Sequence, residues 1–186
     1  IKRAIDKARR NRDTLGGTFE VIVNGVPIGL GSYVHYDRRL DARLAMSVMS
    51  IPAIKAVEIG LGFGYSDKFG SQVHDAIYYN KEKGYYRLTN NAGGLEAGVS
   101  NGEDNVFRAC MKPISTLGNP LNSVDIRTQK PHKAQVERYD TCAVYSAGVV
   151  AEAVVAFEIA SAFLEKFGCD NIKEIEKVFS SFTKNI

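Results

Sequence analysis

Tryptophan is absent from this sequence of 186 residues, and cysteine occurs only three times. Cys110, Cys142 and Cys169 lie far apart, so no two of them have the spacing of paired zinc ligands. An odd number of separated cysteines also argues against a disulfide framework and is typical of thiols in a reducing compartment. The sequence therefore predicts a cytoplasmic protein without a metal site.

Long uncharged apolar runs and a strong excess of one charge are also missing. The most apolar stretch, 149–167, is interrupted by Glu152 and Glu158, and no signal peptide is recognisable. The net charge of +3 suits an anionic small molecule but is too small to indicate nucleic acid binding. We therefore expect a single domain over residues 1–186 that binds neither nucleic acid nor membrane.

Hydrophobic periodicity and breaker residues divide the chain into elements. Helices are predicted at 1–12, 40–50, 149–167 and 172–179, and strands at 18–26, 53–59, 85–88, 106–111, 123–127 and 135–140. The segment 66–83 has no clear pattern. Irregular alternation of helices with hairpin-like strand pairs favours an α+β layered domain, in which antiparallel sheet packs on long buried helices. Because 149–167 is apolar on most of its circumference, we expect this helix to be buried on nearly all sides.

The stretch 89–116, TNNAGGLEAGVSNGEDNVFRACMKPIST, holds most of the polar residues that suggest a ligand. Its glycines permit positive φ and a close approach of backbone to a ligand, and successive N–H groups in such turns bind anions. Lys112, Ser115 and Thr116 follow the apolar strand and suit a phosphate or an electron-rich ring. The alternative interpretation is a pair of tight turns between strands.

Six motifs occur in a fixed order along the chain: DTLGG, GVPIGLG, LDARLAMSVMSIPAIKAVEIGLGF, TNNAGGLEAGVSNG, KPIST and ERYDTCAV. Together they resemble the second half of chorismate synthase, from Asp13 to Gly168. The resemblance implies a β-α-β sandwich with long central helices between two antiparallel sheets, assembled as a homotetramer. It implies a lyase that uses reduced FMN to convert 5-enolpyruvylshikimate 3-phosphate to chorismate, by 1,4-elimination of phosphate in the shikimate pathway. NADP belongs to the same expectation, although the sequence leaves the source of flavin reduction open.

The resemblance also implies roles for individual residues. Asp140 matches the carboxylate placed close to N5 of the flavin, where it would take or relay a proton. A cation and backbone donors beside the flavin would stabilise its anionic reduced form. Lys112 and Arg138, beside hydroxyl groups, suit the phosphates of cofactor and substrate. The positions that match FMN contacts are Pro52, Ala53, Ala97, Lys112, Pro113, Ile114, Ser115, Thr116 and Arg138. We expect Lys112 to Thr116, Ala97 and Arg138 to converge on one concave site.

Several residues depart from the family pattern. Ala97 stands where glycine is common, and Pro52 where asparagine is common, but contacts at both positions would be made largely by backbone. Tyr139 and Tyr145, where relatives more often have other residues, flank Asp140 and leave its environment open. Without the resemblance, Arg138 and Asp140 would be interpreted as a surface ion pair.

The first half of the family's chain carries two active-site histidines and an arginine cluster, and nothing in this sequence matches them. His35, His74 and His132 are expected on the surface or in loops. The chain also begins at Ile1, without an initiator methionine, which predicts a fragment that alone is weak or inactive as a lyase. A second hypothesis is a non-catalytic module of the same fold that binds a flavin phosphate or serves assembly.

Overall fold

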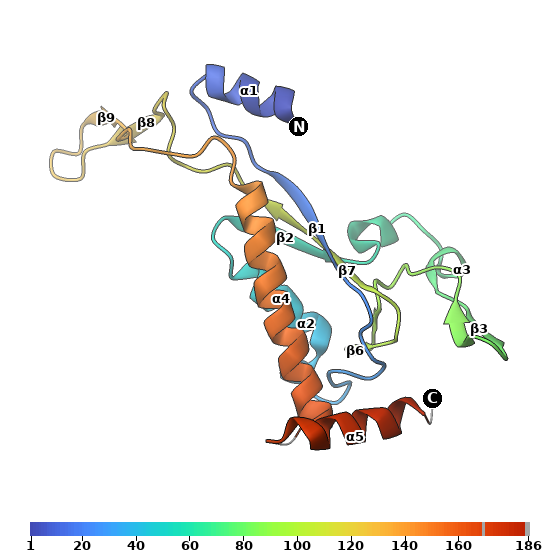
Figure 1. The fold of residues 1–186 in the computed structure, drawn as a ribbon. Helices are drawn as coiled ribbons and strands as arrows, with labels where there is room; N and C mark the ends of the chain where they lie inside the picture. The colour runs from blue at the N-terminus through green and yellow to red at the C-terminus, as the bar shows by residue number, and fades with distance from the viewer. Residues whose placement is uncertain (169, 185–186) are drawn as a thin grey trace.

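The computed structural model describes residues 1–168 and 170–184 (Figure 1). Its helical elements are α1 (Lys2–Arg10), η1 (Tyr36–Arg38), α2 (Leu40–Met49), η2 (Gly62–Tyr65), α3 (Gly70–Val73), α4 (Val144–Phe167) and α5 (Ile172–Thr183). Its strands are β1 (Gly17–Val23), β2 (Ile54–Ile59), β3 (Ile77–Asn80), β4 (Gly84–Arg87), β5 (Leu95–Glu96), β6 (Val99–Ser100), β7 (Asn105–Met111), β8 (Asn122–Val124) and β9 (Pro131–Lys133). Cys169, expected to be a thiol, lies outside the described residues, whereas Cys110 and Cys142 are unpaired, half-buried thiols.

The main sheet is antiparallel and has the order β1-β7-β2. The two edge strands are aligned at the same end of the central strand, because Gly17 and Ile54 each pair with Met111. Side chains of β7 alternate strictly, with every second one buried, as a strand covered on one face requires. Helices α2 and α4 cover that face, whereas the three short hairpins β3–β4, β5–β6 and β8–β9 lie around the sheet (Figure 1). The α+β layered class is confirmed.

The core forms where the two helices meet the sheet. Residues of α2 one turn apart, Leu40, Leu44 and Val48, are almost completely buried. Opposite them α4 buries Ala147 and Ala151, whose small side chains let the helix approach closely. The helix predicted at 40–50 is present, and the residues that it buries follow the helical period.

A polar clamp joins α2 to α4 beside this core. Nε of Arg43 donates to Glu158 at 3.1 Å, and its Nη1 donates to Glu165 at 2.8 Å. Ser47 donates to the same Glu158 carboxylate at 2.8 Å. The side chains of Arg43 and Glu158 are only 13% and 14% exposed. Their charges are therefore screened little by water, and each depends on the other.

The prediction for α4 is corrected in two respects. The helix begins at Val144, five residues before the expected start. It is also not buried on nearly all sides, because Val149 and Phe157 are 66% and 72% exposed. By length and composition alone α4 could cross a membrane, but the Arg43 clamp and buried Ala151 make it a core helix of this domain. The apolar pattern predicted the helix correctly, but it carried no information on which parts of the surface this chain covers.

The strand predicted at 135–140 is wrong, since this segment has no regular structure. Pairing occurs earlier, between β8 and β9, with Ser123 opposite His132. The reason is the intervening turn, in which the Asp125 carboxylate accepts hydrogen bonds from the N–H groups of Arg127 and Thr128. That turn closes the β8–β9 hairpin. The strand that pairs with β8 therefore lies at 131–133 and not at 135–140. The unassigned segment 66–83 contains α3 and β3.

We predict that Arg43→Met destabilises the domain by about 2 kcal/mol, because it leaves the largely buried Glu158 carboxylate unpaired. Thermal unfolding should show a fall in Tm of about 4–8 °C. Arg38→Met is the matched control, since Arg38 lies 3.9 Å from Glu165 with its side chain 58% exposed, and such pairs contribute little. Equal Tm values for the two variants would contradict the role of the clamp.

Candidate functional site

The expected FMN residues of α2–β2 and of β7 meet at one end of the main sheet. Ile54 N donates to Ile51 O at 3.2 Å, which closes a four-residue turn with Pro52 and Ala53 in the middle. Ala53 has a φ of +70°, the conformation that the third position of a type II turn requires. Ala53 O accepts a hydrogen bond from Lys112 N at 2.9 Å. The turn and the KPIST segment are therefore joined directly through backbone.

The DTLGG motif fixes the KPIST segment from its other side. Thr14, only 7% exposed, donates from Oγ1 to Ile114 O at 2.6 Å. A Cβ on Gly16 would lie 2.9 Å from the ring of Pro113, so the close approach requires glycine. The backbone of the KPIST segment is thus fixed, while Lys112 and Ser115 are exposed and Thr116 is half-buried. Among the described residues, no ion pair engages Lys112.

The ERYD segment reaches the same end of the sheet. Leu15 N donates to Thr141 O at 2.7 Å, directly after Asp140. Tyr139 lies against Gly118, where a Cβ would come within 3.1 Å of Cζ of the ring. Arg138 and Asp140 are exposed, and within the described part of the chain neither forms an ion pair. The interpretation of these two residues as a surface ion pair therefore finds no support.

Ala97 lies elsewhere. It occupies the β5–β6 turn with Gly98, at φ values of +50° and +85°, which is the pattern of a type I′ hairpin turn. This hairpin is tied to the beginning of β7, where Asn105 Nδ2 donates to Gly94 O at 3.0 Å. Lys112 follows the other end of that seven-residue strand, about 20 Å away. The structure thus brings the Lys112–Thr116 and Arg138 segments together but does not bring Ala97 to them.

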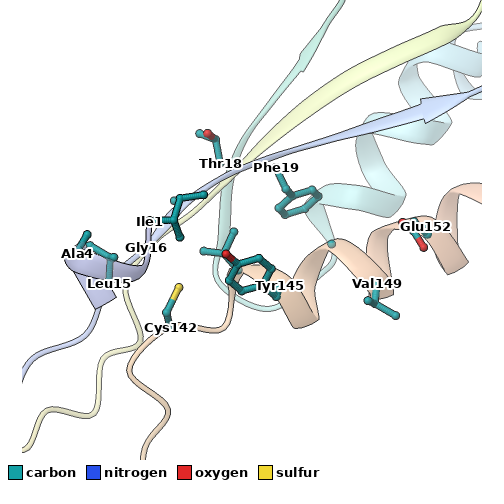
Figure 2. A pocket seen from close by; sticks show the side chains of 13 residues that line it. Ile1, Ala4, Leu15, Gly16, Thr18, Phe19, Cys142, Tyr145, Val149 and Glu152 are labelled. Carbon is teal, nitrogen blue, oxygen red and sulfur yellow. The ribbon is translucent and has the colours of Figure 1, made fainter. Parts of the chain in front are cut away.

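An apolar pocket of about 460 Å³ adjoins the Lys112 end, between α1, the start of β1 and the start of α4 (Figure 2). None of the sequence-predicted FMN residues lines it. Tyr145 and Cys142 do, together with Phe19 and Val149. Sequence reasoning missed the pocket because three distant segments form its wall. The departure from the family pattern at Tyr145 was the one signal near it.

Comparisons with known proteins agree with the six motifs. The family model described as chorismate synthase matches residues 1–164. A chorismate synthase from Geobacter sulfurreducens is 55% identical over 193 aligned residues, which cover 100% of this chain and 49% of the relative. The chain belongs to the chorismate synthase family. Chorismate synthase 1 from Bacillus cereus is 58% identical over 177 residues, covering 95% of this chain and 45% of that protein.

A solved structure titled as a crystal structure of chorismate synthase shares the fold with a TM-score of 0.82 at 43% identity. That alignment covers 99% of this chain and 47% of the solved one. The chain therefore spans about half the length of the chorismate synthases that it matches.

We predict that Ala97→Gly stabilises the domain by about 1 kcal/mol, because an L-residue with a Cβ is strained at φ of +50° and glycine is not. The Tm should rise by about 2–4 °C. The matched control is Ala92→Gly in the preceding turn, where φ is not positive and glycine should lower the Tm through its greater entropy when unfolded. A Tm that falls in both variants would show that Ala97 is unstrained.

Proposed function

We propose that this chain forms the FMN-binding part of a carbon–oxygen lyase that converts 5-enolpyruvylshikimate 3-phosphate to chorismate and phosphate. The observation that carries the proposal is the hydrogen bond between Ala53 and Lys112, which joins two family motifs at one end of the sheet. The family match over residues 1–164 supports this reaction. It also supports the shikimate pathway as the place of the reaction in metabolism and the cytoplasm as its compartment.

The residues at this end fit a phosphorylated, electron-rich cofactor. Lys112 presents an exposed ammonium group, and Ser115 and Thr116 add hydroxyl donors on the same backbone. Charge-assisted hydrogen bonds of this kind are the strong ones for phosphate. Arg138 supplies a second cation from the neighbouring segment. When bound, reduced FMN supplies the electron-rich ring that the elimination requires, and the cations of the chain stabilise its anionic form.

Asp140 is the candidate for proton transfer. Asp140 is exposed at the end of the irregular segment 135–140, next to the backbone hydrogen bond that ties Thr141 to Leu15. A carboxylate whose backbone is fixed but whose oxygens are exposed can meet N5 of a bound flavin and take or relay a proton there. The competing proposal is a non-catalytic flavin-phosphate module, which is favoured by the absence of any ion pair that would orient Asp140 within the described residues.

The chain alone lacks part of the site in this proposal. His35, His74 and His132 are exposed. The remaining substrate ligands would come from the half of the relatives that this chain does not match. The exposed apolar side of α4, including Phe157, gives that half or a neighbouring subunit of a homotetramer a surface to cover.

Lys112→Met should weaken binding of FMN to the chain by about tenfold, because one charge-assisted contact to the phosphate is lost. Fluorescence titration of FMN measures the dissociation constant directly. Lys55→Met, also an exposed lysine but within β2, is the control and should bind FMN as the parent does. Equal affinities for all three proteins would remove Lys112 from the cofactor site.

Asp140→Asn should lower kcat by about 10²–10⁴-fold with little change in FMN affinity, since asparagine keeps the shape of the side chain but cannot accept the proton. The assay requires a complete enzyme, such as a chimaera in which this chain replaces the matching half of the Geobacter sulfurreducens relative. Glu137→Gln, an exposed neighbour, is the control. Single turnover at saturating reduced FMN separates the alternatives: an unchanged rate there would remove Asp140 from the mechanism and favour the non-catalytic module.

A further inference from the structure

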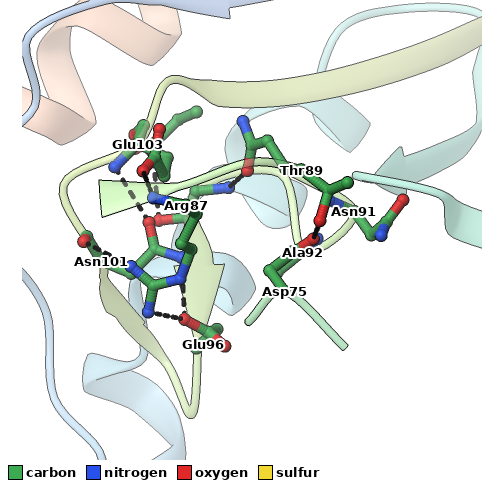
Figure 3. Close-up of polar contacts among 11 residues, drawn as sticks. Asp75, Arg87, Thr89, Asn91, Ala92, Glu96, Asn101 and Glu103 are labelled. Carbon is green, nitrogen blue, oxygen red and sulfur yellow. Dashed lines mark hydrogen bonds and ion pairs between the residues drawn. The ribbon is translucent and has the colours of Figure 1, made fainter. Parts of the chain in front are cut away.

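Asp75 lies between α3 and β3 and is only 9% exposed, although no motif singled it out. Its carboxylate faces the TNNAGG motif (Figure 3). Oδ1 accepts from Thr89 Oγ1 at 2.5 Å and from Asn91 N at 2.9 Å, and Oδ2 accepts from Ala92 N at 2.8 Å. One side chain therefore binds three donors of a four-residue stretch.

The carboxylate is held in its charged form. Burial by itself raises the pKa of Asp75, but the hydrogen bonds from Thr89, Ala92 and Asn91 outweigh it and bring the pKa below its ordinary value. A charged acceptor forms stronger hydrogen bonds than a neutral one. The loop is therefore fixed by charge-assisted bonds at neutral pH.

The two asparagines of the motif are also used within the protein. Asn90 Oδ1 accepts from Gly94 N at 2.7 Å, and its Nδ2 donates to Asp104 O at 2.8 Å. Asn91 O accepts from Leu61 N at 2.9 Å and from the Tyr65 hydroxyl at 2.6 Å. The motif that suggested a ligand is thus held mainly by hydrogen bonds to other segments of the protein.

A second set of contacts fixes the other end of the β5–β6 hairpin. The Arg87 guanidinium, 13% exposed, donates from Nη2 to Glu96 at 2.7 Å. Asn101 Nδ2 donates to the same Glu96 oxygen at 2.8 Å (Figure 3). Glu96 directly precedes Ala97, which is exposed. Both sides of the hairpin are therefore anchored, and within its turn Ala97 is exposed, whereas Gly98 is buried and its O accepts a hydrogen bond from Leu40 N at 2.8 Å.

We propose that Asp75 is a positioning residue: it holds the loop 89–94 in the conformation that presents the Ala97 turn to the flavin. This inference rests on the proposed function for its second half: the family resemblance implies that Ala97 contacts FMN, and because Ala97 and Lys112 lie at opposite ends of β7, this contact is separate from those at Lys112. The first half, the hold of Asp75 on the loop, stands on the three hydrogen bonds alone.

Asp75→Asn tests it with little change in volume. The asparagine amide would turn an NH2 group toward backbone N–H donors, so at least one of the three bonds becomes a contact between two donors. Hydrogen exchange of amides 89–98 should become at least about tenfold faster while amides of β1 and β7 stay unchanged. FMN should bind about tenfold more weakly, and the visible circular dichroism of the flavin at saturation should change.

Two further variants make the test decisive. Thr89→Val removes one bond with nearly the same shape and should show the same changes at smaller size; it decides the matter if Asp75→Asn does not fold. Asp67→Asn, an exposed aspartate in the same segment, should behave as the parent.

Unchanged exchange in the loop would overturn the positioning role. Faster exchange with normal FMN affinity and flavin spectrum would overturn the functional half and reduce Asp75 to a structural anchor. A parent chain that binds no FMN would instead refute the proposed function, and with it the functional half, while the exchange data still decide the first half.

Discussion

The pairing of β7 on both of its edges is the constraint on which the rest of this structure depends. Because the strand is central, its direction decides which segments can share an end of the sheet. Met111 lies opposite both Gly17 and Ile54, so the segments before β1, before β2 and after β7 must meet. These three segments are DTLGG, the Pro52–Ala53 turn and KPIST. The site at Lys112 is thus a consequence of strand register rather than of the loops themselves.

The same constraint explains why sequence reasoning located the motifs correctly but misjudged their convergence. Strand composition and glycine turns identified β7 and the loops on either side of it, as local patterns can. The distance between Ala97 and Lys112, however, follows from the extended length of β7 between them, which the flanking motifs do not encode. Pro52 and Lys112, far apart in sequence, come together because β2 is the edge partner of β7. Pairing partners are tertiary information, and only the family resemblance supplied any of it beforehand.

Helix α4 shows a different limit. Apolar periodicity predicts a helix from the energy of burying its side chains, but the partner that buries them need not be in the same chain. Ala151 and Val155 are buried, whereas Val149 and Phe157 on other sides are exposed. In this chain the inner face of α4 is covered, whereas parts of its outer faces are not. Composition alone cannot separate these two kinds of face.

Strained backbone conformations occur near both ends of the main sheet. Among the described residues, the non-glycine residues with positive φ are Arg12, Ala53, Ala97 and Gln129. Ala53 and Ala97 are also positions at which the family resemblance implies contact with FMN. A Cβ at positive φ costs about 1–2 kcal/mol, so each conformation must be imposed by its surroundings. For Ala53 the surroundings are the turn closed at Ile54 and the bond to Lys112; for Ala97 they are the contacts of Glu96 and the hydrogen bond from Leu40 N to Gly98 O at 2.8 Å. Several contacts therefore fix the backbone at each of these two alanines, as a rigid contact with a cofactor requires.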